Sequence, residues 1–268
     1  MARIFSHRNS ADRVEPPARL PSRERLIVWG SILAVTAFSW LVLARIALTQ
    51  HAINRGMISS MNAGGVRWSL RDAWFIFAMW TMMMAAMMLP SASPMIEMYV
   101  RMARGRSTER VGHAGFFAIG YLIAWTGFSA AITAVQYALE RTGIVGGAMR
   151  VGPFAGGLLL IATGIYQVTP FKQACLTQCR SPLGYFMTEW RSGQRGALEM
   201  GLNHGVFCVG CCWLLMTLMF VAGAMNLLWA AALTLFVLLE KAAPWGDTVA
   251  RASGMVMVAS GIALAAFG

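Results

Sequence analysis

The chain has 268 residues, of which 57% are hydrophobic and only 12% are charged, with 22 Lys and Arg against 11 Asp and Glu. A water-soluble domain is nearer to about 45–50% apolar and about 25% charged, so this chain has too few charges to cover a soluble surface. The composition excludes a soluble enzyme and indicates an integral membrane protein. The basic residues are scattered between apolar runs rather than gathered on one face, so they do not indicate nucleic-acid binding.

Seven apolar segments approach the length that a helix needs to cross a hydrocarbon core of about 30 Å. They span residues 26–48, 73–89, 115–139, 153–168, 205–225, 227–239 and 254–267. Pro90 and Pro94 are expected to end the second helix, and Pro170 the fourth, because proline lacks the backbone donor that a helix requires. We therefore predict an all-α polytopic bundle of six to seven transmembrane helices, with one domain over residues 26–268 after a basic tail over residues 1–25.

The positions of the basic residues predict the orientation, because cytoplasmic loops of membrane proteins are enriched in Lys and Arg. With a cytoplasmic N-terminus, 16 of the 22 basic residues lie on the cytoplasmic side and six on the other. The six are Arg45, Arg55, Arg67, Arg71, Arg141 and Arg150. The bias predicts a multi-pass protein with the N-terminus inside and the C-terminus outside. The first apolar run is also too long for the core of a signal peptide.

Methionine is concentrated in the second segment, where seven of the 20 Met residues lie within residues 79–95. Met83 and Met87 are four residues apart and share one helix face, while Met84 and Met88 form a parallel row. Thioether sulfur is a soft, neutral ligand that suits Cu(I) better than Zn²⁺ or hard cations. Methionine also fills irregular apolar cores, so packing is an equally good interpretation of these rows.

The longest of the later loops, residues 171–203, holds Cys175 and Cys179 in a C-x3-C spacing. Two thiolates at this spacing can bind one metal ion, or they can form a disulfide under oxidation. The alternative is a pair of ordinary loop cysteines, and the presence of a second cysteine cluster weighs against it.

That second cluster lies in the fifth segment, where His204, Cys208 and Cys211 occupy helical positions i, i+4 and i+7, and Cys212 adjoins them. Imidazole and thiolate together bind copper, zinc or iron–sulfur centres, and soft sulfur favours Cu(I). A buried cysteine can instead serve as a small hydrophobe. Because the second helix is expected to end on the side where the fifth begins, the Met rows are expected at the same depth as this cluster.

Glu240 and Lys241 end the sixth segment on that same side. An interfacial ion pair between them is the favoured interpretation, and a carboxylate that orients His204 is the alternative. His51 and His113 are isolated and have no predicted role. The sequence contains no phosphate-binding loop, dinucleotide-binding glycine pattern or Ser–His–Asp set.

Four motifs, taken in order, resemble a bacterial family of predicted metal-binding integral membrane proteins. The motifs are MMMxxMMLPSxxPM at 82–95, GxYQxTPxKxxCLxxCR at 164–180, HGxxCxGCCW at 204–213 and EK at 240–241. The resemblance runs from about residue 73 to the C-terminus and implies a copper chaperone of the bacterial inner membrane, in a family linked to copper supply for a tyrosinase-type polyphenol oxidase. The family's signature positions fall here on Met83, Met87, Met88, Cys175, Cys179, His204, Cys208, Cys211 and Cys212.

Residues and resemblance together predict a chaperone or transporter that handles Cu(I), rather than an enzyme. Such a protein would pass copper by exchange among Cys, His and Met ligands. His204, Cys208 and Cys211 are the expected primary ligands, and Cys175 and Cys179 a capture or hand-off pair. The expected partners are the lipid bilayer and either a copper-dependent enzyme or a soluble copper carrier, and another soft metal is the alternative cargo. A membrane thiol–disulfide oxidoreductase that uses the two cysteine pairs is the first alternative function. A non-enzymatic membrane assembly subunit is the second.

Overall fold

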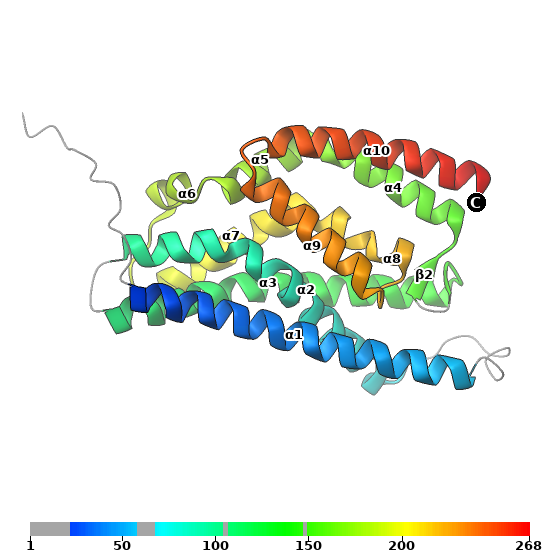
Figure 1. The fold of residues 1–268 in the computed structure, drawn as a ribbon, viewed down its shortest axis with the longest axis horizontal. Helices are drawn as coiled ribbons and strands as arrows, with labels where there is room; N and C mark the ends of the chain where they lie inside the picture. The colour runs from blue at the N-terminus through cyan, green and yellow to red at the C-terminus, as the bar shows by residue number, and fades with distance from the viewer. Residues whose placement is uncertain (1–21, 58–67, 104–106, 147–148) are drawn as a thin grey trace, which may run out of the picture.

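The structure is a computed structural model that describes residues 22–57, 68–103, 107–146 and 149–268 (Figure 1). Most of the predicted basic tail, residues 1–21, lies outside the described residues. The described chain is all-α apart from a short antiparallel ribbon, β1 (Val145–Gly146) and β2 (Arg150–Val151). The helices are α1 (Ser22–Met57), α2 (Leu70–Met102), α3 (Ser107–Arg141), α4 (Pro153–Gln167), α5 (Pro170–Arg180), α6 (Pro182–Glu189), α7 (Gly193–Thr217), α8 (Met219–Ala222), α9 (Leu227–Ala242) and α10 (Gly246–Phe267).

The long helices run in alternating directions through one bundle, so that α1 starts at the left end in Figure 1 and α10 finishes at the right end. Five helical stretches are long and apolar enough to cross a membrane, and the pair formed by α4 and α5, bent by 65°, makes a sixth if it is counted as one span. The five are Arg23–Thr49, Leu70–Met102, Glu109–Arg141, Gly193–Ala222 and Gly246–Phe267. The all-α class is thereby confirmed for the described residues, with five to six candidate membrane spans where six to seven were predicted. At 16 residues, α9 is shorter than any of them.

In the centre of the bundle, α3 and α7 approach each other closely because small residues line their contact. A Cβ atom on Gly201 or Gly205 of α7 would overlap the backbone of α3, and one on Gly120 would overlap the backbone of α7. Small residues serve this purpose in membrane proteins, where close backbone packing helps to drive helix association. The approach brings Tyr121 of α3 against His204 of α7, with ring centroids 5.6 Å apart.

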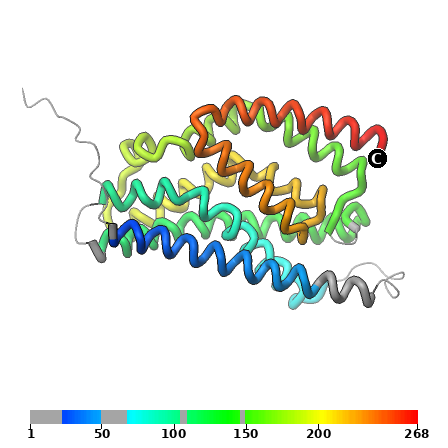
Figure 2. Tube along the Cα trace, in the orientation of Figure 1, coloured from blue at the N-terminus to red at the C-terminus, as the bar shows by residue number. Residues whose placement is uncertain are grey.

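At one edge of the bundle, α4 lies alongside α10 (Figure 2). Gly157 and Gly164 of α4 face Gly261 and Gly254 of α10, and a Cβ atom at any of the four would meet the opposite backbone. Only 17% of the most apolar 18-residue stretch of α10 is buried inside the protein. This outer pair therefore leaves much of its apolar surface for lipid and holds one flank of the site described below.

The prediction that α2 ends at Pro90 or Pro94 is wrong, because the helix continues to Met102. Pro94 cannot donate to the Pro90 carbonyl, but the Ser93 hydroxyl donates to that carbonyl at 2.8 Å. Prolines are tolerated inside membrane helices when a nearby side chain satisfies a freed backbone group in this way. Ser93 thus compensates for the proline that follows it, and Pro94 does not end the helix.

The predicted loop over residues 171–203 is also wrong, because it contains α5, α6 and the start of α7. Pro170 ends α4 as predicted, but it also occupies the first turn of α5, and the Thr169 side chain accepts a hydrogen bond from the backbone N–H of Lys172. Similarly, α7 begins at Gly193, well before the predicted start at residue 205. The polar first turns of these helices hid them from a search for apolar runs.

Candidate metal centre

Three cysteine sulfurs from two helices converge in the core. The Sγ atoms of Cys179 on α5 and of Cys208 and Cys211 on α7 all lie within 4.8 Å of one another, and all three residues are buried. Soft sulfur atoms this close together can bind a single metal ion. The structure thus groups one member of the predicted hand-off pair with two of the predicted primary ligands.

The position of α5 is fixed by ion pairs at both of its ends. Near its start, Lys172 pairs with Glu240 of α9 at 2.5 Å, and both side chains are buried. At its end, Arg180 pairs with Asp247 of α10 at 2.5 Å and donates to the carbonyl of Ala243 at 2.9 Å. Because both ends are held, the cysteine-bearing face of α5 stays against α7.

Cys175 lies on that same face, one helical turn before Cys179, and next to Gly210 of α7. A Cβ atom on Gly210 would lie only 2.9 Å from the Cys175 sulfur, so the glycine leaves the space that this sulfur occupies. The Tyr166 hydroxyl of α4 donates to the Gly210 carbonyl and ties the same turn to the outer helix pair. Cys175 is therefore a neighbour of the three-sulfur group rather than a member of it.

Cys208 has two polar neighbours besides the other cysteines. The Lys241 Nζ lies 2.9 Å from its sulfur, and the Tyr121 hydroxyl lies 3.0 Å from it. Lys241 also donates to the Ser91 hydroxyl at 3.2 Å, and Tyr121 donates to the Met88 carbonyl at 3.0 Å. Thiolate is the form of cysteine that binds metals, and a neighbouring cation stabilises that negative charge. These contacts join α2, α3, α7 and α9 around one sulfur.

The predicted interfacial pair between Glu240 and Lys241 is wrong. Successive side chains on a helix point about 100° apart, so Glu240 reaches Lys172 while Lys241 reaches Cys208. The alternative, in which Glu240 orients His204, is not observed either, since His204 Nδ1 has no hydrogen-bond partner among the described residues.

His204 lies one helical turn before Cys208 and is buried among aromatic rings. Its ring centroid is 6.0 Å from that of Phe117, 5.6 Å from that of Tyr121 and 5.6 Å from that of Tyr185. Burial raises the pKa of Tyr185, which lies on α6 outside the candidate spans, and its hydroxyl donates to the Met200 carbonyl at 2.7 Å. His204 is not a member of the three-sulfur group, although it adjoins that group along α7.

The remaining predicted ligands border the site. The thiols of Cys211 and Cys212 donate to the Cys208 carbonyl at 3.1 and 2.8 Å, which fixes their orientation. Met83, Met87 and Met88 are buried on α2. The backbone carbonyl of Met88 accepts a hydrogen bond from the Tyr121 hydroxyl, which also contacts the Cys208 sulfur.

Sequence reasoning gave Lys241 a different partner and missed Lys172 and Tyr121. A compositional signal for the lysines was present, because Lys172 and Lys241 are the only lysines among 22 basic residues and both lie at this site. Tyr121 carried no comparable signal, since a tyrosine in an apolar segment is ordinary. Its role depends on the close packing of α3 against α7.

The fold and the donor set define a class, namely an all-α protein with several candidate membrane spans and a buried cluster of sulfur ligands. The sequence profile of a copper chaperone family, PpoB2, matches residues 77–264, which is most of the chain, and the protein belongs to this family. The predicted resemblance is thereby confirmed. Comparison with curated proteins and with solved structures gave no match.

Proposed function

We propose that the protein is a membrane copper chaperone that holds Cu(I) on the sulfurs of Cys179, Cys208 and Cys211 and releases it by ligand exchange. The observation that carries this proposal is the convergence of three buried sulfurs within 4.8 Å of one another. Copper is the cargo here, so the protein needs to bind and release the ion and has no bond to cleave.

The chemistry of the site favours Cu(I) over hard cations. Thiolate and thioether sulfurs are soft ligands, and oxygen ligands, which hard cations prefer, do not belong to the three-sulfur group. Burial keeps water from the sulfurs, and the ammonium of Lys241 beside Cys208 offsets part of the negative charge that thiolates bring into the core. Zn²⁺ also binds cysteine, and competition between the two metals distinguishes it from Cu(I).

Transfer is proposed to occur by replacement of one ligand with another, so that the ion never becomes free. Cys175 lies one turn from Cys179 on α5, and Cys212 and His204 adjoin Cys208 and Cys211 on α7, so each can take over one position in the coordination sphere. The thioethers of Met83, Met87 and Met88 on α2 provide weaker, neutral ligands in the same core. No covalent change in the protein is required.

We further propose that the chain crosses the membrane seven times, with α9 as a short sixth pass and the N-terminus inside. The alternating directions of the helices in Figure 1 support an odd number of passes. Lys172 and Lys241 contact partners inside the bundle, so they are not loop charges, but 14 of the remaining 20 basic residues still favour the same side. A soluble copper carrier or a copper-dependent enzyme would then exchange copper with the protein.

A matched pair of variants tests the three-sulfur site. Cys175 and Cys179 lie on the same face of α5 and are each 8% exposed, but only Cys179 belongs to the group. We expect Cys179→Ser to lower the Cu(I) affinity of the purified, reduced protein by at least about tenfold, and Cys175→Ser to lower it by less. Elemental analysis and competition with a Cu(I) chelator measure both. Equal retention of copper in the two variants would contradict the proposal.

A thiol–disulfide oxidoreductase remains the second candidate, because the same proximity of Cys179 to Cys208 and Cys211 would permit exchange between the two pairs. In the structure all five cysteines are free. Trapping of thiols in intact cells separates the two functions. A copper carrier is expected to hold reduced cysteines throughout, whereas an oxidoreductase would show a partly oxidised population that shifts when an oxidant is added.

A further inference from the structure

A cavity of about 520 Å³ lies at the end of the bundle where α2 finishes and α3 and α7 begin. Three of the residues that line it carry atoms that can bind Cu(I), namely Met102 of α2, His113 of α3 and Met187 of α6. His113 and Met102 are partly buried, and Met187 is 66% exposed. Imidazole and thioether are neutral ligands that suit Cu(I).

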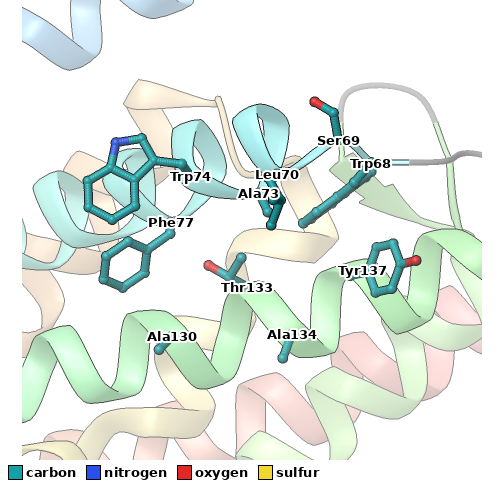
Figure 3. A pocket seen from close by; sticks show the side chains of 10 residues that line it. All are labelled: Trp68, Ser69, Leu70, Ala73, Trp74, Phe77, Ala130, Thr133, Ala134 and Tyr137. Atoms are coloured by element: carbon teal, nitrogen blue, oxygen red, sulfur yellow. The ribbon is translucent and has the colours of Figure 1, made fainter.

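A second cavity of the same volume has a lining without Met or His side chains. It lies at the opposite end, where α2 begins and α3 ends, and Figure 3 shows Trp74, Phe77 and Tyr137 around it. Its lining is aromatic and apolar, with the hydroxyls of Ser69 and Thr133, and contains no Met, His or Cys. Of these two cavities, only the one at the α2 C-terminal end is lined by Met and His side chains.

Residues of α3 connect the first cavity to the cysteines. His113, Phe117 and Tyr121 are spaced by four residues and form one row, which covers about 12 Å along the helix. The rings of Phe117 and Tyr121 flank His204, and the Tyr121 hydroxyl is 3.0 Å from the Cys208 sulfur. The row therefore begins at the cavity and ends at the three-sulfur group.

A second row on α2 follows the same course. Met88, Met95 and Met102 are spaced by seven residues and share one helix face, with Met102 at the cavity and the Met88 carbonyl bonded to Tyr121. Tyr99 of α2 stacks on Phe117 of α3 at 5.7 Å, so the two helices meet along this stretch. Between the rows, the buried Nδ1 of His204 has no hydrogen-bond partner among the described residues and is free to bind a metal ion.

We propose that this cavity is a surface loading site, at which Cu(I) binds His113, Met102 and Met187 before it moves past His204 to the cysteines. The inference rests on the proposed copper function and adds where the ion first binds. Three neutral ligands leave the bound ion with a net positive charge, which a cavity open to solvent can tolerate and a buried core cannot. The cysteines carry the compensating negative charge, so the affinity rises inward and copper moves in that direction.

A full-length variant without the tight site tests the loading site at equilibrium. In purified Cys179→Ser/Cys208→Ser/Cys211→Ser protein in detergent, titrated with the acetonitrile complex of Cu(I), we expect one weakly bound equivalent to remain. Adding His113→Ala should lower its affinity by about tenfold, equivalent to about 1.4 kcal/mol. Loss of all copper binding in the triple variant, or an unchanged affinity after His113→Ala, would overturn the proposal.

The rate of copper uptake by protein with intact cysteines gives a second test that does not depend on the triple variant. We expect Met187→Leu to slow loading of the cysteines by up to about tenfold while the final copper content stays the same. Met255→Leu on α10, where Met255 is 68% exposed, is the matched control and should load at the wild-type rate. Equal rates for the two variants would reject the loading site and leave the chaperone function standing. Wild-type protein that takes up no Cu(I) would reject both.

Discussion

The two lysines of the chain lie in neighbouring parts of the site but have different partners. Lys172 on α5 is buried against the Glu240 carboxylate at 2.5 Å, and it also donates to the side chain of Gln167. Lys241 on α9 is partly buried and faces the Cys208 sulfur at 2.9 Å, and within the described residues it forms no ion pair with a carboxylate. The Lys172 ammonium is thus neutralised by a carboxylate, whereas the Lys241 ammonium lies beside a cysteine sulfur.

This difference separates a structural charge from a functional one. A buried pair such as Lys172–Glu240 contributes little net stability compared with apolar residues, but it defines how α5 sits against α9. Lys241 adds no such fixed pair, and its counter-charge is a sulfur that the proposed cargo also uses. Mutation of the Lys172–Glu240 pair should therefore change the stability of the protein, whereas mutation of Lys241 should change its copper binding.

The largest expected effect is on the structural pair. Glu240→Gln leaves the buried ammonium of Lys172 without its counter-charge, which should lower the free energy of unfolding by about 3–5 kcal/mol. Chemical denaturation of the purified protein in detergent measures this. The control is Glu199→Gln, which breaks the exposed Arg191–Glu199 pair and should cost less than about 1 kcal/mol. Similar losses in both variants would remove the distinction between the two lysines.

Lys241→Met should produce the converse result. We expect Cu(I) affinity to fall by about 10–100-fold, because the charge beside Cys208 is lost, while the free energy of unfolding changes by no more than about 1 kcal/mol. Chelator competition and denaturation on the same preparation give the two values. Lys241→Arg keeps the charge and should retain most of the affinity. A Lys241→Met protein that unfolds as readily as Glu240→Gln would show that Lys241 is also structural.

The smallest expected effect concerns Tyr121. Tyr121→Phe removes the hydroxyl that contacts the Cys208 sulfur and the Met88 carbonyl, so Cu(I) affinity should fall by the few-fold that corresponds to about 0.5–1.5 kcal/mol. Tyr185→Phe removes a buried hydroxyl that donates to the Met200 carbonyl instead, and should leave copper affinity unchanged. A larger effect from Tyr185→Phe would mean that general packing, rather than contact with Cys208, sets the affinity.

Much of the fold follows from apolar segment lengths, which located the long helices but not all of their ends, because lipid imposes one clear requirement on a spanning helix. The same search failed at α5 and α6, since these short helices carry polar turns and are stabilised by tertiary ion pairs such as Arg180–Asp247. It also ended α2 too early, because the compensation of Pro94 by Ser93 is a contact between side chain and backbone that hydropathy does not express.

For the site, helical periodicity correctly placed Cys208 and Cys211 on one face, because that relation lies within a single helix. Periodicity could not show that Cys179 joins them, since this depends on the bend between α4 and α5 and on the anchoring of α5 at both ends. For the same reason the different partners of Lys172 and Lys241 emerge only when α5, α7 and α9 are assembled.

The most direct test of the account is X-ray absorption at the copper edge on the reduced, full-length protein loaded with one equivalent of Cu(I). The account predicts a first coordination shell made only of sulfur atoms, which in the Cys179→Ser/Cys208→Ser/Cys211→Ser variant is replaced by a weaker shell that includes nitrogen. It also predicts that the Cys175→Ser variant keeps the shell made only of sulfur. A first shell made only of nitrogen and oxygen in the unmutated protein, or an unchanged shell made only of sulfur in the triple variant, would contradict it.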